Sequence, residues 1–182
     1  MLAAFGFVHG ASEWLDLLAL IAGDTPAFAM ARFCTMTGSF VLLFEFARLE
    51  AVRLGFKMPG RWIYAPMMVF VAWGAHLAGL NGASTFARYA IALTGALGTG
   101  AVLACHARDA LPAEKRWIAS AVIGFVLYAL AAGVVVPPVA GWAGDVIDYA
   151  DFSGFTACRS SSCADSWRAG SPSRSGAIGA SA

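Results

Sequence analysis

Residues 117–136, which read WIASAVIGFVLYALAAGVVV, decide the fold class of this chain. The stretch contains no charged residue and no histidine. As a helix it can cross a bilayer core of about 30 Å, which takes about 20 apolar residues. Four more segments of the same kind precede it, at about residues 1–23, 28–47, 62–80 and 89–105. We therefore predict an all-α integral membrane protein, an antiparallel bundle of about five transmembrane helices.

The overall composition leads to the same class of protein. Of the 182 residues, 59% are hydrophobic and 13% are charged, against about 25% charged in an ordinary soluble domain. The formal net charge of +1 leaves no basic surface for nucleic acid. The chain contains no nucleophile elbow, Walker loop or HExxH helix. We expect the lipid bilayer as a partner, no nucleic acid, and no enzymatic activity from this polypeptide alone.

The short joints between the apolar segments predict the orientation. Turn residues end each apolar run, at residues 23–26, 58–60, 81–84 and 109–112. Lys and Arg concentrate in residues 48–61 and 106–116, and basic loops stay on the cytoplasmic side. We therefore expect a multi-pass protein of the bacterial inner membrane with these two joints inside. Trp62 and Trp117 each follow an Arg and are predicted to anchor the bundle at the headgroup level.

The two ends of the sequence carry separate expectations. The first segment has no Lys or Arg before its apolar run, which argues against a signal peptide and suggests a start codon assigned too far downstream. From Cys158 the chain becomes rich in Ser, Arg, Gly and Ala. We divide it into a membrane domain, residues 1–157, and a disordered tail, residues 158–182, read out of frame after a frameshift near Ala157. The alternative is a genuine disordered exterior tail.

The first segment also carries the most informative polar cluster. His9, Glu13 and Asp16 follow the i, i+4, i+7 spacing that places them on one helix face. Ionisable residues at membrane depth normally face a bundle interior and have a function. His76 lies at a depth from which it can reach Asp16, so these four residues form the candidate sensing face. The simpler interpretation is a set of polar side chains satisfied inside the bundle.

No metal or cofactor is expected at this face. A zinc or copper ion on His9, Glu13 and Asp16 stays an alternative, but the pattern lacks a second Cys or His helix. A haem between His76 and His106 is disfavoured because the two lie at opposite ends of their spans.

Small residues recur at four-residue spacing in the third and fourth segments. Such stripes let helix backbones approach closely. We predict that these two helices touch through the following residues: Gly74, Ala78, Gly82, Ala92, Ala96 and Gly100.

Residues 5–18, FGFVHGASEWLDLL, resemble the Phe-Gly-x-x-His-Gly-x-x-Glu-Trp-x-Asp opening of the membrane input domain of certain bacterial sensor histidine kinases and diguanylate cyclases. The similarity continues through Phe44-Glu45-Phe46-Ala47-Arg48 to about Gly154. It implies several spans that feed a cytoplasmic output module, and a possible homodimer, as in sensor kinases. The ligand is unknown.

The resemblance predicts a sensory input domain of a bacterial signalling protein that lacks its kinase or cyclase module. Two alternatives remain. One is a small transporter or metal-ion conduit that uses the stripe of His9, Glu13 and Asp16 as its path. The other is a structural membrane subunit that docks on a partner through its glycine stripes.

Overall fold

The computed structural model describes residues 1–134, all of them within one compact unit, Met1–Asp148. The expectations for the end of the fifth segment, the boundary at residue 157 and the tail lie outside these residues. The described part is helical throughout, apart from short joints, and contains no strand. Its elements are α1 (Leu2–Ala22), α2 (Pro26–Arg53), the 3-10 turn η1 (Arg61–Ile63), α3 (Tyr64–Ala87), the π-helical η2 (Arg88–Leu93), α4 (Thr94–Asp109) and α5 (Pro112–Val134). The all-α prediction is confirmed.

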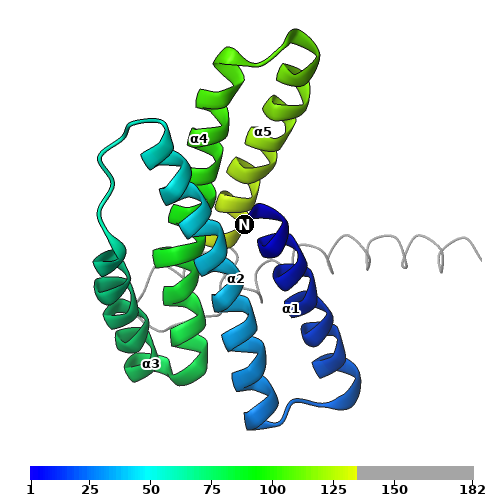
Figure 1. Cartoon of the computed structure of the whole chain (residues 1–182). Helices are drawn as coiled ribbons and strands as arrows, with labels where there is room; N and C mark the ends of the chain where they lie inside the picture. Colours follow the sequence, from blue (N-terminus) through cyan, green and yellow to red (C-terminus); the bar gives the residue numbers. More distant parts are fainter. Residues whose placement is uncertain (135–182) are drawn as a thin grey trace, which may run out of the picture. The chain divides into compact units, whose positions relative to one another are not determined.

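Four helical segments of the described chain are long and apolar enough to cross a membrane: Leu2–Ala22, Pro26–Arg53, Arg61–Asp109 and Pro112–Ala132. The 49-residue segment Arg61–Asp109 is not straight, because Ala78 and Gly79 have non-helical backbone angles. The chain reverses there, and Figure 1 shows a hairpin whose first leg is the part of α3 before this point and whose second leg continues into η2 and α4. The bundle therefore consists of five antiparallel legs, as expected.

The position of this reversal differs from the sequence prediction. Residues 81–84 are helical, and the turn lies at Ala78–Gly79, where Gly79 adopts a positive φ of 58°. That conformation favours glycine because it has no Cβ atom. Phe70 and Phe86 face each other across the hairpin with ring centroids 4.6 Å apart. The fourth leg thus begins soon after Gly79, about two turns before the predicted Tyr89.

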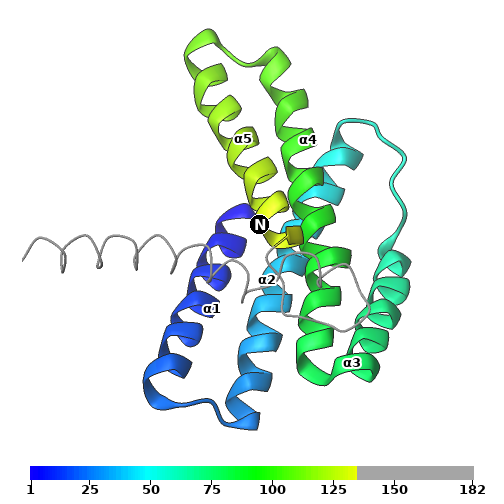
Figure 2. The same cartoon turned by 180° about the vertical axis from the view of Figure 1, so that it is seen from behind.

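α2 and α4 form the centre of the bundle. α1 packs against α2, α5 packs against α4, and α3 lies on the other side of α2 from α1 (Figure 1). The view from behind in Figure 2 shows the same order. Two groups of buried apolar side chains hold these helices together, one around Phe40 and Ile91 and the other around Leu43 and Ala96.

The joints alternate between the two ends of the bundle. The α2–α3 joint and the α4–α5 joint lie at one end in Figure 1, and the basic residues lie in these joints or in the helix ends next to them. The α1–α2 joint and the reversal at Gly79 lie at the other end. Trp62 and Trp117 follow the two basic joints along the chain, and their side chains are exposed. This arrangement is the one that the charge pattern predicts.

Candidate functional site

His9 is the centre of a polar network between three helices. Its Nδ1 atom lies 3.1 Å from Oγ of Ser39 on α2, and its Nε2 atom lies 3.2 Å from the hydroxyl oxygen of Tyr128 on α5. Each contact is within hydrogen-bond range. His9 and Ser39 lie near the middle of α1 and α2 respectively, far from the helix ends. Both nitrogens of one imidazole therefore join α1 to two other helices deep in the apolar region.

Aromatic rings enclose the imidazole of His9. The ring of Phe5 is stacked on it at 5.2 Å, and Phe40 lies at 5.7 Å. The ring of Tyr128 meets it edge-on at 5.5 Å. Aromatic pairs at these separations stabilise a fixed ring orientation beyond the area that they bury. The imidazole is thus fixed by packing as well as by hydrogen bonds.

Glu13 and Asp16 continue the same stripe on α1, toward the Gly23 end of the helix. Oε1 of Glu13 lies 3.8 Å from Nε2 of His9, and 65% of its side chain is exposed. Asp16 accepts a hydrogen bond of 2.6 Å from Arg32 on α2. A second nitrogen of Arg32 donates at 2.6 Å to Asp24 in the joint. Arg32 therefore links α1 and the α1–α2 joint to the start of α2.

The structure does not bring His76 into this cluster. His76 is exposed on α3, and its ring lies 6.3 Å from that of Trp73 on the same helix. α1 and α3 lie on opposite sides of α2 in both views (Figures 1 and 2). The depth argument that paired His76 with Asp16 was wrong because depth does not say which helices are neighbours.

A second buried polar cluster lies at the basic end of α2. Arg48 donates two hydrogen bonds to Glu45, at 2.7 and 2.6 Å, and Tyr64 donates a third to Glu45 at 2.6 Å. Arg48 also lies 3.4 Å from the carbonyl oxygen of Pro59. Glu45 and Arg48 thus form an i, i+3 ion pair on α2, and the phenol of Tyr64 binds to the same carboxylate. We assign this cluster the structural task of fixing the α2–α3 joint on α2.

The stripes of small residues pack within the chain. A Cβ atom added to Gly74 would lie 2.5 Å from the carbonyl oxygen of Gly82, and Ala78 lies between them at the reversal. The third and fourth legs therefore touch through Gly74 and Gly82, two members of the first stripe, and not through the pairing of the two stripes that the sequence predicted. Ala92 and Ala96 are fully buried in the two apolar groups, and Gly100 faces α5. The second stripe therefore serves mainly α2 and α5, and it is not free for a partner.

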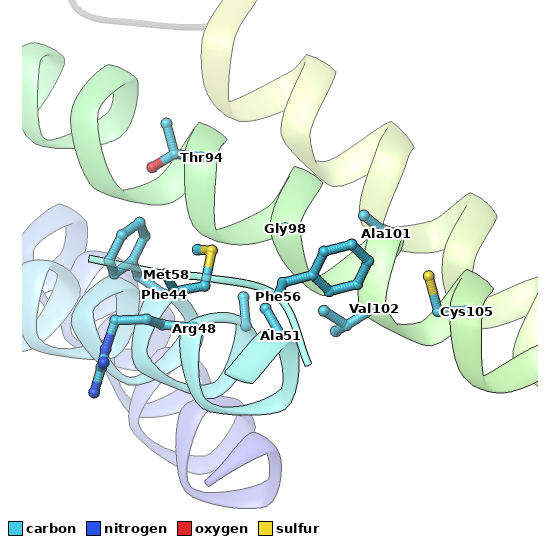
Figure 3. Close-up of a pocket in the computed structure, with 11 residues that line it drawn as sticks. Phe44, Arg48, Ala51, Phe56, Met58, Thr94, Gly98, Ala101, Val102 and Cys105 are labelled. Carbon is cyan, nitrogen blue, oxygen red and sulfur yellow. The ribbon is translucent and has the colours of Figure 1, made fainter. Parts of the chain in front are cut away.

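Residues of these helices line two cavities that lie close to the polar clusters. The first, of about 260 Å³, lies between α2, the α2–α3 joint and α4. Phe56 and Met58 of the joint extend over it in Figure 3, facing Thr94 and Gly98 of α4. Arg48 is its one charged lining residue within the described chain, and its guanidinium is bound to Glu45. The first cavity is therefore an apolar space without a free polar group.

The second cavity is an open groove of about 350 Å³ between α1 and α5. Its lining residues are Phe5, His9, Ala121, Gly124, Phe125 and Tyr128. Among these described residues, His9 and Tyr128 supply the polar side-chain atoms. The groove thus opens onto the same network that joins α1, α2 and α5. Within residues 1–134, no three His, Cys, Asp or Glu side chains lie close enough together to hold a metal ion.

The residues that contact His9 from other helices were not predictable from the sequence. Ser39 and Tyr128 lie in apolar runs where a single hydroxyl gives no signal. Arg88 lies just before the predicted fourth segment, and in the structure it is inside the fourth leg at the start of the π-helical turn, with a nitrogen 3.6 Å from the sulfur of Met36. π-Helical turns are frequent at functional sites, and Ile91 of this turn belongs to the same apolar group as Phe40, whose ring lies 5.7 Å from that of His9.

Comparisons of the chain with known protein families, with curated proteins and with solved structures found no match.

Proposed function

We propose that this chain is the membrane-embedded sensory domain of a bacterial signalling protein, in which a stimulus at the His9 network changes how α1 packs against α2 and α5. The observation that carries the proposal is the placement of one imidazole between these three helices. A polar group at this depth is costly unless it is satisfied, and it normally has a function. The resemblance of residues 5–18 to sensor-kinase input domains points to the same role.

The hydrogen bonds of His9 are weak enough for α1 to change between two packings against α2 and α5. The contacts of His9 to α2 and α5 are single hydrogen bonds, and each of these is worth about 0.5–1.5 kcal/mol net. A stimulus that favours one packing by a few kcal/mol is sufficient to shift such an equilibrium almost completely. α5 begins at Pro112, directly after the α4–α5 joint that the proposal assigns to the cytoplasm. A change in the contact of α5 with His9 can therefore pass to this joint and from there to a cytoplasmic output module, which on this proposal a later part of the gene or a partner supplies.

The proposal also includes the orientation. The α2–α3 and α4–α5 joints lie at one end of the bundle and are assigned to the cytoplasm. The basic residues that support this assignment lie in these joints or in the adjoining helix ends: Arg53, Lys57, Arg108 and Lys115. The catalytic step of signalling is assigned to the output module and not to this chain, which acts as a homodimer of sensory domains in the inner membrane.

The direct test is to read the gene in every frame from the codon for Pro137 to well beyond Ala182. We expect another frame, or an adjacent gene, to encode a histidine kinase or cyclase module. A neighbourhood without any signalling module would contradict the proposal and favour the transporter or partner-subunit alternatives.

A further inference from the structure

We propose that the groove between α1 and α5 binds an uncharged, lipid-soluble ring compound that carries a hydroxyl group, and that this hydroxyl donates a hydrogen bond to the oxygen of Tyr128. The inference rests on the proposed function and deepens it, because it names the class of ligand for the same site. Three properties of the groove carry it: its access, its lining and the direction of its hydrogen bonds.

Access to the groove is through the lipid. It lies between α1 and α5, whose neighbouring positions Phe7 and Ile123 are 81% and 60% exposed. Exposed apolar side chains on a membrane-spanning helix face the acyl chains. A molecule that reaches the groove by this route must dissolve in the bilayer, and a charged compound is excluded by its cost at that depth.

The aromatic residues that line the groove favour a ligand with a planar ring. Phe5 lines the groove from α1 and Phe125 lines it from α5, and the imidazole of His9 is stacked on Phe5. Gly124 leaves open space in the lining, because a Cβ atom at this position would have nothing within 4 Å. A planar ring placed over Gly124 gains the offset or edge-on contacts that aromatic groups prefer.

The direction of the hydrogen bonds follows from Ser39. Its Oγ atom lies 2.6 Å from the carbonyl oxygen of Met36, which can only accept, so the single hydroxyl hydrogen of Ser39 points there. Toward His9, the same oxygen must then accept. The hydrogen of a neutral imidazole is therefore on Nδ1, and Nε2 carries the lone pair.

This tautomer fixes what Tyr128 offers to a ligand. Because Nε2 of His9 accepts, the hydroxyl of Tyr128 donates its hydrogen to it over 3.2 Å. The phenol oxygen keeps its lone pairs but has no second hydrogen. A ligand with a hydroxyl group can donate a hydrogen bond to this oxygen. A ligand with a carbonyl or ether oxygen cannot, because neither that oxygen nor the oxygen of Tyr128 has a free hydrogen to donate.

The test uses the chain with isotope-labelled histidine in phosphatidylcholine nanodiscs and nitrogen NMR. The probes are para-octylphenol and its methyl ether, para-octylanisole, which share shape and apolar character but differ in the donor. We expect the His9 signal to show hydrogen on Nδ1 and to shift saturably with the phenol, with binding of the ether weaker by about tenfold or more. His76 and His106 are internal controls in the same spectrum and should not shift.

Gly124→Leu provides the matched blocking variant, because Gly124 lines the groove and a Cβ atom at this position meets nothing within 4 Å. Gly6→Leu is its control, since Gly6 also has open space around it but does not line the groove. We expect loss of phenol binding in the first variant and retention in the second.

Equal binding of the phenol and the ether, or unchanged binding in Gly124→Leu, would overturn the assignment. So would a His9 signal with its hydrogen on Nε2. These failures are separate from failure of the proposed function, which the gene sequence and the helix distances described below test without any ligand.

Discussion

The hydroxyl oxygen of Tyr128 lies 3.2 Å from Nε2 of His9, so that two residues 119 positions apart in the chain join the first and the last described helices. The opposite nitrogen of the same ring reaches Ser39 on α2. One side chain thus sets the mutual position of three helices. This relationship is the basis of the sensory proposal, and the following predictions test it and the structure around it.

The alternation of the joints predicts the accessibility of engineered cysteines. In a background without the native cysteines, Lys57→Cys and Lys115→Cys should react with a membrane-impermeant maleimide only after the cells are opened. Asn81→Cys, which is exposed near the reversal, should react in intact cells. The physical reason is that basic joints remain cytoplasmic. Labelling of Lys57→Cys and Asn81→Cys from the same side would contradict the antiparallel arrangement.

The ion pair of Arg32 with Asp16 should be measurable by a double-mutant cycle. Asp16→Asn and Arg32→Gln each break a 2.6 Å contact between α1 and α2. Because the two side chains are 47% and 25% exposed, we expect a coupling energy of about 0.5–1 kcal/mol rather than that of a buried pair. Unfolding in mixed micelles with increasing SDS gives the free energies. A coupling energy of zero would show that the pair does not hold the turn.

The close approach of Gly74 and Gly82 predicts strong sensitivity to a single methyl group. Gly74→Ala places a Cβ atom 2.5 Å from the backbone of Gly82 and 2.6 Å from the ring of Phe86. We expect it to destabilise the hairpin by about 1–3 kcal/mol. Gly38→Ala is the control, because a Cβ atom there meets nothing within 4 Å, and it should be neutral or stabilising by about 0.5–1 kcal/mol. Equal stability of the two variants would refute the contact.

The cluster at Glu45 predicts an order of severity among three substitutions. Glu45→Gln leaves the buried guanidinium of Arg48 without its counter-ion and should cost about 3–5 kcal/mol. Tyr64→Phe removes one donor to Glu45 and should cost about 1–2 kcal/mol. Arg53→Gln breaks an exposed pair with Glu50 and should cost less than about 1 kcal/mol. Folded yield and thermal stability in detergent give the order, and the reverse order would contradict the structure.

The helices themselves were largely predictable from the sequence, since an apolar run of membrane length has few other structures open to it. α1 matches the first predicted segment closely. α2 continues past residue 47 to Arg53, because Glu45 with Arg48 and Glu50 with Arg53 form i, i+3 pairs that carry the helix beyond the apolar run. The apolar run ends where charged residues begin, whereas the helix can continue through those residues.

The reversal within α3 was harder to place. Asn81, Gly82 and Ser84 are typical turn residues, yet they are helical, and the turn forms at Gly79. The reason is packing: placing Gly82 inside a helix lets it lie directly against Gly74. Local turn preference and close helix packing compete for the same glycines, and the sequence alone does not say which prevails.

The candidate site was predictable on α1 and not beyond it. Helical spacing identified His9, Glu13 and Asp16 because these residues are local to one helix. Their partners depend on how neighbouring helices are rotated about their axes, which periodicity does not record. The structure therefore added three residues to the site, Ser39, Arg32 and Tyr128. It also showed that His76 is not part of the site.

The central claim, that His9 holds α1 in one of two packings against α5, is tested most directly by spin-label distances in nanodiscs. With the native cysteines replaced, labels at the exposed positions Phe7 and Ile123 report the separation of α1 and α5. We predict two populated distances whose weights change in His9→Ala and stay unchanged in His76→Ala. A single distance, identical in all three proteins, would contradict the account.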